Sequence, residues 1–154
     1  MHKYKLGLFC AIQFLILTVA MGGSTRADAA PVDAFQVSQS GTMAAGTEGL
    51  NLTFTVPTGK QLVIEYVAGN CFVPAGQTCV LSILTQVGTA TTGTQFNLQT
   101  DGVGAFGGGN VLWRAGQQVK LYAKSGTIVT LRADRNSPTG AATVTFMSVS
   151  GYLE

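Results

Sequence analysis

The carboxylates are the side chains of this sequence best suited to acid–base chemistry. The only histidine is His2, in an N-terminal segment that we expect to be removed. Ser-His-Asp, Cys-His and histidine-ligated metal sites are therefore not expected, and no other catalytic motif is present. A pair of carboxylates, as in glycoside hydrolysis, is the remaining route to catalysis, with Glu65 or Asp101 at its centre.

Glu65 interrupts an apolar run between Val63 and Val67, in a segment that we expect to be covered on both faces. A buried carboxylate has a perturbed pKa and can mark a functional site. A structural ion pair with an arginine such as Arg132, or a position at a sheet edge, is the simpler interpretation. We therefore predict a buried pair of Glu65 and Arg132, and the catalytic role remains the alternative.

Two aromatic residues are candidates for ligand binding. Trp113 is the only tryptophan, and Tyr122 lies between Lys120 and Lys124 on the polar side of a predicted strand. Exposed rings beside polar groups would suit a carbohydrate ligand. Because aromatic rings are more often buried for their apolar area, a core position for Trp113 is the competing interpretation.

Cys71 and Cys79 are the cysteines that remain after the N-terminal segment, and Pro74-Ala75-Gly76 between them is typical of a turn. In an exported protein, an even pair of cysteines predicts a disulfide, here one that pins a hairpin or loop. A redox pair is the functional alternative. A metal site is not expected without histidine, and no cofactor is predicted.

The N-terminus has the pattern of a signal peptide. Lys3 and Lys5 precede an apolar stretch over residues 6–20, and Ala27-Asp28-Ala29 matches a cleavage site. The stretch is shorter than the roughly 20 residues that span a bilayer, which argues against an uncleaved anchor. We expect a signal peptide over residues 1–29 and a secreted or periplasmic mature chain over residues 30–154, outside the membrane.

The mature chain is electrically balanced. Removing residues 1–29 takes away Lys3, Lys5, Arg26 and Asp28, and leaves six basic and six acidic side chains. The basic patch that characterises nucleic-acid-binding proteins is therefore not expected.

Apolar and polar residues alternate along several short segments, as in half-buried strands. Examples are residues 50–56, 119–124 and 129–134, separated by turn sequences such as Pro57-Thr58-Gly59-Lys60. We predict a single all-β domain: an antiparallel β-sandwich, jelly-roll-like, of eight or nine strands. The glycine-rich residues 102–109 are expected to form a flexible loop.

Three segments carry a resemblance. Residues 54–67 (FTVPTGKQLVIEYV), 119–123 (VKLYA) and 150–154 (SGYLE) resemble small exported bacterial β-sandwich proteins of uncharacterised function. The last segment is also similar to the final strand of complement C1q and tumour-necrosis-factor-like jelly rolls, which assemble as trimers. The resemblance implies a sandwich fold and a bacterial origin, and it supplies no functional residues.

From these features we expect an exported, non-enzymatic binding or structural module. Its partner would be a glycan, a cell-surface component or another protein. The polar faces, which are rich in Thr, Ser, Gln and Asn, are also compatible with a homo-oligomer. The alternative function is a carboxylate-dependent glycan hydrolase or lyase.

Overall fold

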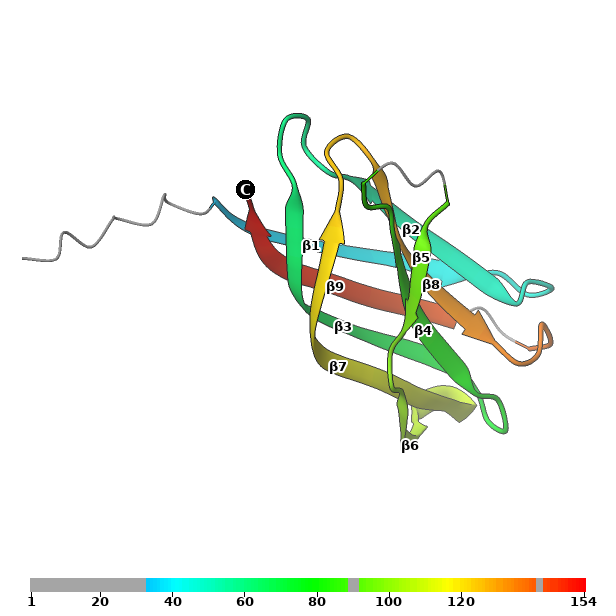
Figure 1. Ribbon diagram of the computed structural model, residues 1–154. Coiled ribbons are helices and arrows are strands. Elements are labelled where there is room, and N and C mark those ends of the chain that lie inside the picture. Colours follow the sequence, from blue (N-terminus) through cyan, green and yellow to red (C-terminus); the bar gives the residue numbers. More distant parts are fainter. Residues whose placement is uncertain (1–32, 89–91, 141–142) are drawn as a thin grey trace, which may run out of the picture. The chain divides into compact units, whose positions relative to one another are not determined.

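The computed structural model describes residues 33–88, 92–140 and 143–154, without the side chains of residues 143–145. Within these ranges the chain forms nine strands in two antiparallel sheets (Figure 1), which confirms the predicted β-sandwich. The expected signal peptide and its cleavage site after Ala29 lie outside the described residues.

The strands are arranged in the two sheets in a jelly-roll order. The five-stranded sheet has the order β1 (Asp33–Met43), β9 (Thr143–Leu153), β3 (Leu62–Pro74), β7 (Asn110–Ala123) and β6 (Asp101–Phe106). The four-stranded sheet has the order β2 (Gly49–Thr55), β8 (Ile128–Arg135), β4 (Cys79–Thr85) and β5 (Thr94–Asn97). Apart from β6, the orders 1-9-3-7 and 2-8-4-5 are those of a jelly roll with two Greek keys.

Alternation along the strands produces the core between the sheets. On β8, Val129, Leu131 and Ala133 are buried, as their alternation with polar residues predicted. Leu131 lies opposite Leu52 of β2 and Ile83 of β4, and both partners belong to the same apolar cluster. Burial of one face of each sheet therefore holds the two layers together.

Two strands depart from the sequence prediction. Residues 102–109, expected to be a loop, form most of β6 and the 3₁₀ turn Gly107–Gly109 that leads into β7. All six residues of β6 are exposed, so the strand has no apolar alternation to reveal it. β1 pairs along its whole length with β9, and no strand was predicted there.

A β-bulge in β3 positions the outer face of the five-stranded sheet. The register against β7 and β9 shifts between Ile64 and Tyr66, so Glu65 has no partner on either neighbouring strand. Ile64 and Val67 both face the core, while Glu65 and Tyr66 are both exposed. The extra residue therefore turns Tyr66 outward from a segment that is otherwise largely buried.

Candidate functional site

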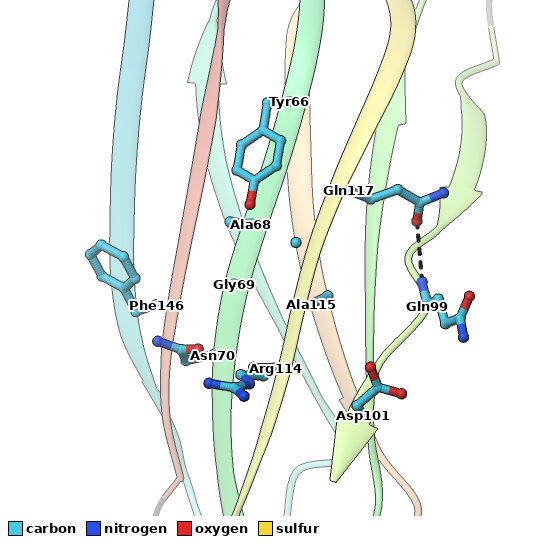
Figure 2. Close-up of a pocket in the computed structure, with 11 residues that line it drawn as sticks. Tyr66, Ala68, Gly69, Asn70, Gln99, Asp101, Arg114, Ala115, Gln117 and Phe146 are labelled. Atoms are coloured by element: carbon cyan, nitrogen blue, oxygen red, sulfur yellow. Dashed lines mark hydrogen bonds between the residues drawn. The ribbon is translucent and has the colours of Figure 1, made fainter. Parts of the chain in front are cut away.

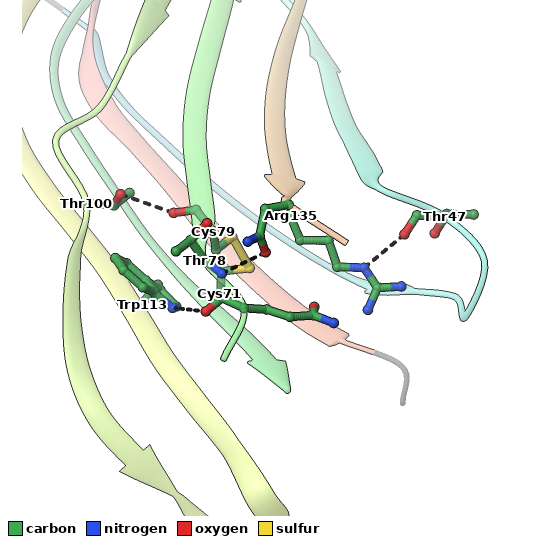
Figure 3. The surroundings of a disulfide bond; sticks show 9 residues. Thr47, Cys71, Thr78, Cys79, Thr100, Trp113 and Arg135 are labelled. Atoms are coloured by element: carbon green, nitrogen blue, oxygen red, sulfur yellow. Dashed lines mark hydrogen bonds between the residues drawn. A yellow bond between two sulfur atoms is a disulfide. The ribbon is translucent and has the colours of Figure 1, made fainter. Parts of the chain in front are cut away.

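A disulfide closes the hairpin between β3 and β4. Cys71 and Cys79 are bonded, with Cα atoms 6.3 Å apart, and both residues are buried. Two neighbouring segments support the hairpin: Trp113 Nε1 of β7 donates to the carbonyl of Gln77 at 3.1 Å, and Thr100 Oγ1, just before β6, donates to the carbonyl of Cys79 at 3.1 Å (Figure 3). The predicted structural disulfide is confirmed.

Trp113 belongs to this support rather than to an exposed platform. Its half-buried ring packs against the core cluster, and its indole N–H is bonded to Gln77. A Cβ added at Gly102 would lie 3.3 Å from the ring, so the β6 backbone covers part of it. The geometry matches the core interpretation of Trp113.

The predicted buried pair of Glu65 and Arg132 is wrong. Arg132 lies on β8 in the other sheet and forms a salt bridge with Asp134, with Nε and Oδ2 2.7 Å apart. Hydrogen bonding to Asp134, together with its charge, raises the pKa of the exposed Arg132 guanidinium. Glu65 is exposed on the outer face of the five-stranded sheet, since it follows the core residue Ile64, and alternation along the sequence does not reveal the bulge that places Tyr66 on the same face.

Arg135, the last residue of β8, is a buried arginine. It is 3% exposed, and its guanidinium donates to the carbonyls of Thr47, Ala44 and Pro138 at 2.9, 3.1 and 3.0 Å. These contacts join the β1–β2 loop to the β8–β9 loop (Figure 3 shows the Thr47 bond). The role of Arg135 is structural.

A depression lies on the outer face of the five-stranded sheet, where a row of small residues crosses three strands. Ala68 of β3 lies opposite Ser148 of β9 and Gly116 of β7. Because directly opposed residues project from the same face, the small side chains leave a hollow between larger neighbours. We call this the Tyr66 depression; its volume is about 590 Å³.

Tyr66 extends along the sheet over the glycine of this row. A Cβ added at Gly116 would lie 2.6 Å from the Tyr66 hydroxyl, so the glycine makes room for the side chain. Tyr66 is nevertheless 42% exposed. Figure 2 shows the hydroxyl directed along β3 towards Ala68. The depression therefore contains an aromatic ring that is supported by the sheet and accessible from solvent.

A second row of paired residues, two positions further along β3, supplies another ring and the polar groups of the Tyr66 depression. Asn70 lies opposite Phe146 on one side and Arg114 on the other, and Arg114 lies opposite Asp101 of β6. Phe146 is 46% exposed. Within the described part of the chain, the side chains of Asn70, Arg114 and Asp101 make no hydrogen bond or ion pair, although they line one depression (Figure 2).

The other predicted ligand-binding residue, Tyr122, lies further along the same face. It is 36% exposed and lies opposite Val63, whose other neighbour is Tyr152. Val63 is 1% exposed although it does not belong to the core cluster. Its position between Tyr122 and Tyr152 fits this burial. Tyr122 is not among the residues that line the Tyr66 depression.

Sequence reasoning missed Tyr66 and Phe146. Tyr66 lay in a run assigned to the core, and no property of the sequence marks the bulge that exposes it. Among residues 33–88, 92–140 and 143–154, no cluster of His, Cys, Asp or Glu could hold a metal ion. No helix in the same ranges has the length and apolar character needed to cross a membrane.

Comparison of the chain with known protein families and with curated proteins gave no match. The site is therefore interpreted from its own chemistry.

Proposed function

We propose that this protein is a non-enzymatic binding module that holds a polysaccharide on the outer face of its five-stranded sheet. The observation that carries the proposal is the exposed Tyr66 ring in a depression whose side chains Asn70, Asp101 and Arg114 have no partner in the part of the chain that the structure describes. Binding sites in proteins commonly combine apolar rings with a few convergent polar groups.

The chemistry of the depression suits a sugar. The C–H face of a pyranose can pack against the rings of Tyr66 and Phe146, which removes apolar area from water. Its hydroxyl groups can accept hydrogen bonds from Arg114 and donate them to Asp101, while the Asn70 amide can do both. Since these three side chains have no protein partner among the described residues, binding would not require an existing bond to be broken.

The geometry favours binding over hydrolysis. Glycosidases place two carboxylates within about 10 Å of each other on either side of the scissile bond. Asp101 lines the Tyr66 depression, whereas Glu65 lines a different one on the same face. In this proposal Asp101 is a hydrogen-bond acceptor for the ligand.

We also propose that the protein is exported and acts in a periplasmic or extracellular space, as its sequence resemblance to exported bacterial proteins implies. The confirmed disulfide supports an oxidising compartment outside the cytoplasm. N-terminal sequencing of the protein from its native host tests this: the mature chain should begin at Ala30.

The binding proposal is tested on residues 30–154 with a panel of polysaccharides: cellulose, xylan, β-1,3-glucan, chitin, starch, alginate and peptidoglycan. We expect saturable binding to at least one, and a loss of about tenfold or more in affinity for Tyr66→Ala. Phe106→Ala is the matched control, because Phe106 is an exposed ring of the same sheet outside the Tyr66 depression.

Tyr122→Ala in the same assay decides whether the tyrosine chosen from sequence takes part. Absence of binding across the panel, or full binding by a folded Tyr66→Ala variant, would contradict the proposed function.

A further inference from the structure

A second depression lies beside the first on the same sheet face. It is lined by Tyr66 and Glu65 of β3, Gln118 and Lys120 of β7, and Ser150 and Tyr152 of β9, with a volume of about 560 Å³. Tyr66 lines both depressions, and Ser150 and Gln118 are its direct cross-strand neighbours. The Tyr66 row therefore separates two adjoining hollows.

The two depressions together make a long track. Phe146 lines the first and Tyr152 the second, and both lie on β9. At about 3.3 Å per residue, these positions are roughly 20 Å apart along the strand. A track of this length is longer than a single sugar unit and runs parallel to the strands across an exposed face.

Each depression contains charges of both signs. The first has Arg114 and Asp101, and the second has Lys120 and Glu65. With one cation and one anion in each, neither depression has a net charge that would attract an ionic polymer. The paired signs favour a ligand that offers both donors and acceptors, as sugar hydroxyls do.

We infer that the ligand is an extended, uncharged polysaccharide whose internal segment occupies both depressions at once, with Tyr66 at the centre of the track. This inference rests on the proposed function and adds the length and charge of the ligand to it. Affinity should therefore grow with chain length beyond a disaccharide, and added salt should change it little.

The test uses calorimetry with the disaccharide and hexasaccharide fractions of whichever polysaccharide binds in the panel. We expect the hexasaccharide to bind more than tenfold tighter. A longer chain offers several overlapping binding positions, but their statistical advantage is only a few-fold, so a tenfold gain requires new contacts. The affinity should be the same at low and high salt.

A variant of the second depression distinguishes the contributions of the two depressions to binding. Gln118→Ala combined with Lys120→Ala alters exposed side chains, so folding should be preserved. It should remove most of the hexasaccharide's advantage and leave binding of the disaccharide unchanged. Lys124→Ala is the control, since Lys124 follows β7 and lines neither depression.

The outcomes distinguish this inference from the proposed function. Equal affinities for the two fractions, or an unaffected hexasaccharide in the double variant, would overturn the inference and leave the proposed function standing. If the protein instead prefers alginate and this binding weakens with added salt, the inference that the ligand is uncharged is wrong. If no polysaccharide binds, the proposed function fails first.

Discussion

At the scale of single residues, Gly151 shows how closely two backbones approach at the bulge. It lies opposite Ile64 on β3, next to the register shift, and a Cβ there would overlap the carbonyl oxygen of Val63. Because that oxygen belongs to the backbone, a side chain at position 151 would force the strands apart.

Gly151→Ala should lower the free energy of unfolding by about 3 kcal/mol, because overpacking against backbone cannot relax locally. Urea unfolding followed by circular dichroism measures the change. Gly107→Ala is the control, since a Cβ there meets nothing within 4 Å and its φ is not positive, and it should change stability by less than about 0.5 kcal/mol. Equal stability of the two variants would contradict this account of the bulge.

Arg135 and Arg132 contrast a buried and an exposed guanidinium on one strand. Arg135→Ala would leave the carbonyls of Ala44, Thr47 and Pro138 without this donor, and should cost about 3 kcal/mol. Arg132→Ala removes an exposed salt bridge to Asp134 and should cost at most about 1 kcal/mol. Thermal unfolding of both variants measures the two losses of stability. A larger loss for Arg132→Ala than for Arg135→Ala would contradict the structural role of Arg135.

At the scale of elements, the disulfide fixes the turn between β3 and β4. Cys71 and Cys79 are eight positions apart in the sequence, and the entropy of closing so short a loop in the unfolded chain corresponds to about 2.5 kcal/mol. Replacement of both cysteines by alanine should lower the unfolding free energy by about this amount and preserve the fold.

Two measurements check the disulfide prediction. Denaturant unfolding gives the stability difference, and mass spectrometry of the non-reduced mature chain should show it two hydrogens lighter than the reduced form. Free thiols in the native protein, or an unchanged stability in the double variant, would contradict the role of the disulfide.

At the scale of the whole molecule, both sheets share one core. Leu131 of the four-stranded sheet and Ile64 of the five-stranded sheet belong to the same buried cluster, so neither sheet can lose its partner without exposing apolar area. We expect the domain to unfold in one cooperative transition.

The single tryptophan makes this expectation easy to measure. Trp113 fluorescence monitors β7 and the disulfide hairpin, whereas far-ultraviolet circular dichroism monitors all the strands. The two signals should change at the same denaturant concentration. An earlier fluorescence transition would show that the β6–β7 edge unfolds separately from the sandwich.

Local pattern alone determined the fold class and the disulfide. Val129, Leu131 and Ala133 alternate with polar residues, and a strand with one buried face requires that period. Cys71 and Cys79 flank a turn sequence, and a hairpin brings such residues together. Both features depend on neighbours in the chain, which is why they could be predicted.

The candidate site was decided by the tertiary structure. The bulge at Glu65 reverses the alternation of β3 and exposes Tyr66. The predicted pairing of Glu65 with Arg132 was wrong because the two residues belong to different sheets and Arg132 pairs with Asp134. The small residues Ala68 and Gly116, which line the hollow, meet across two strands that are distant in sequence. A one-residue shift of register would move each of them to the other face, so only the pairing of the strands determines this surface.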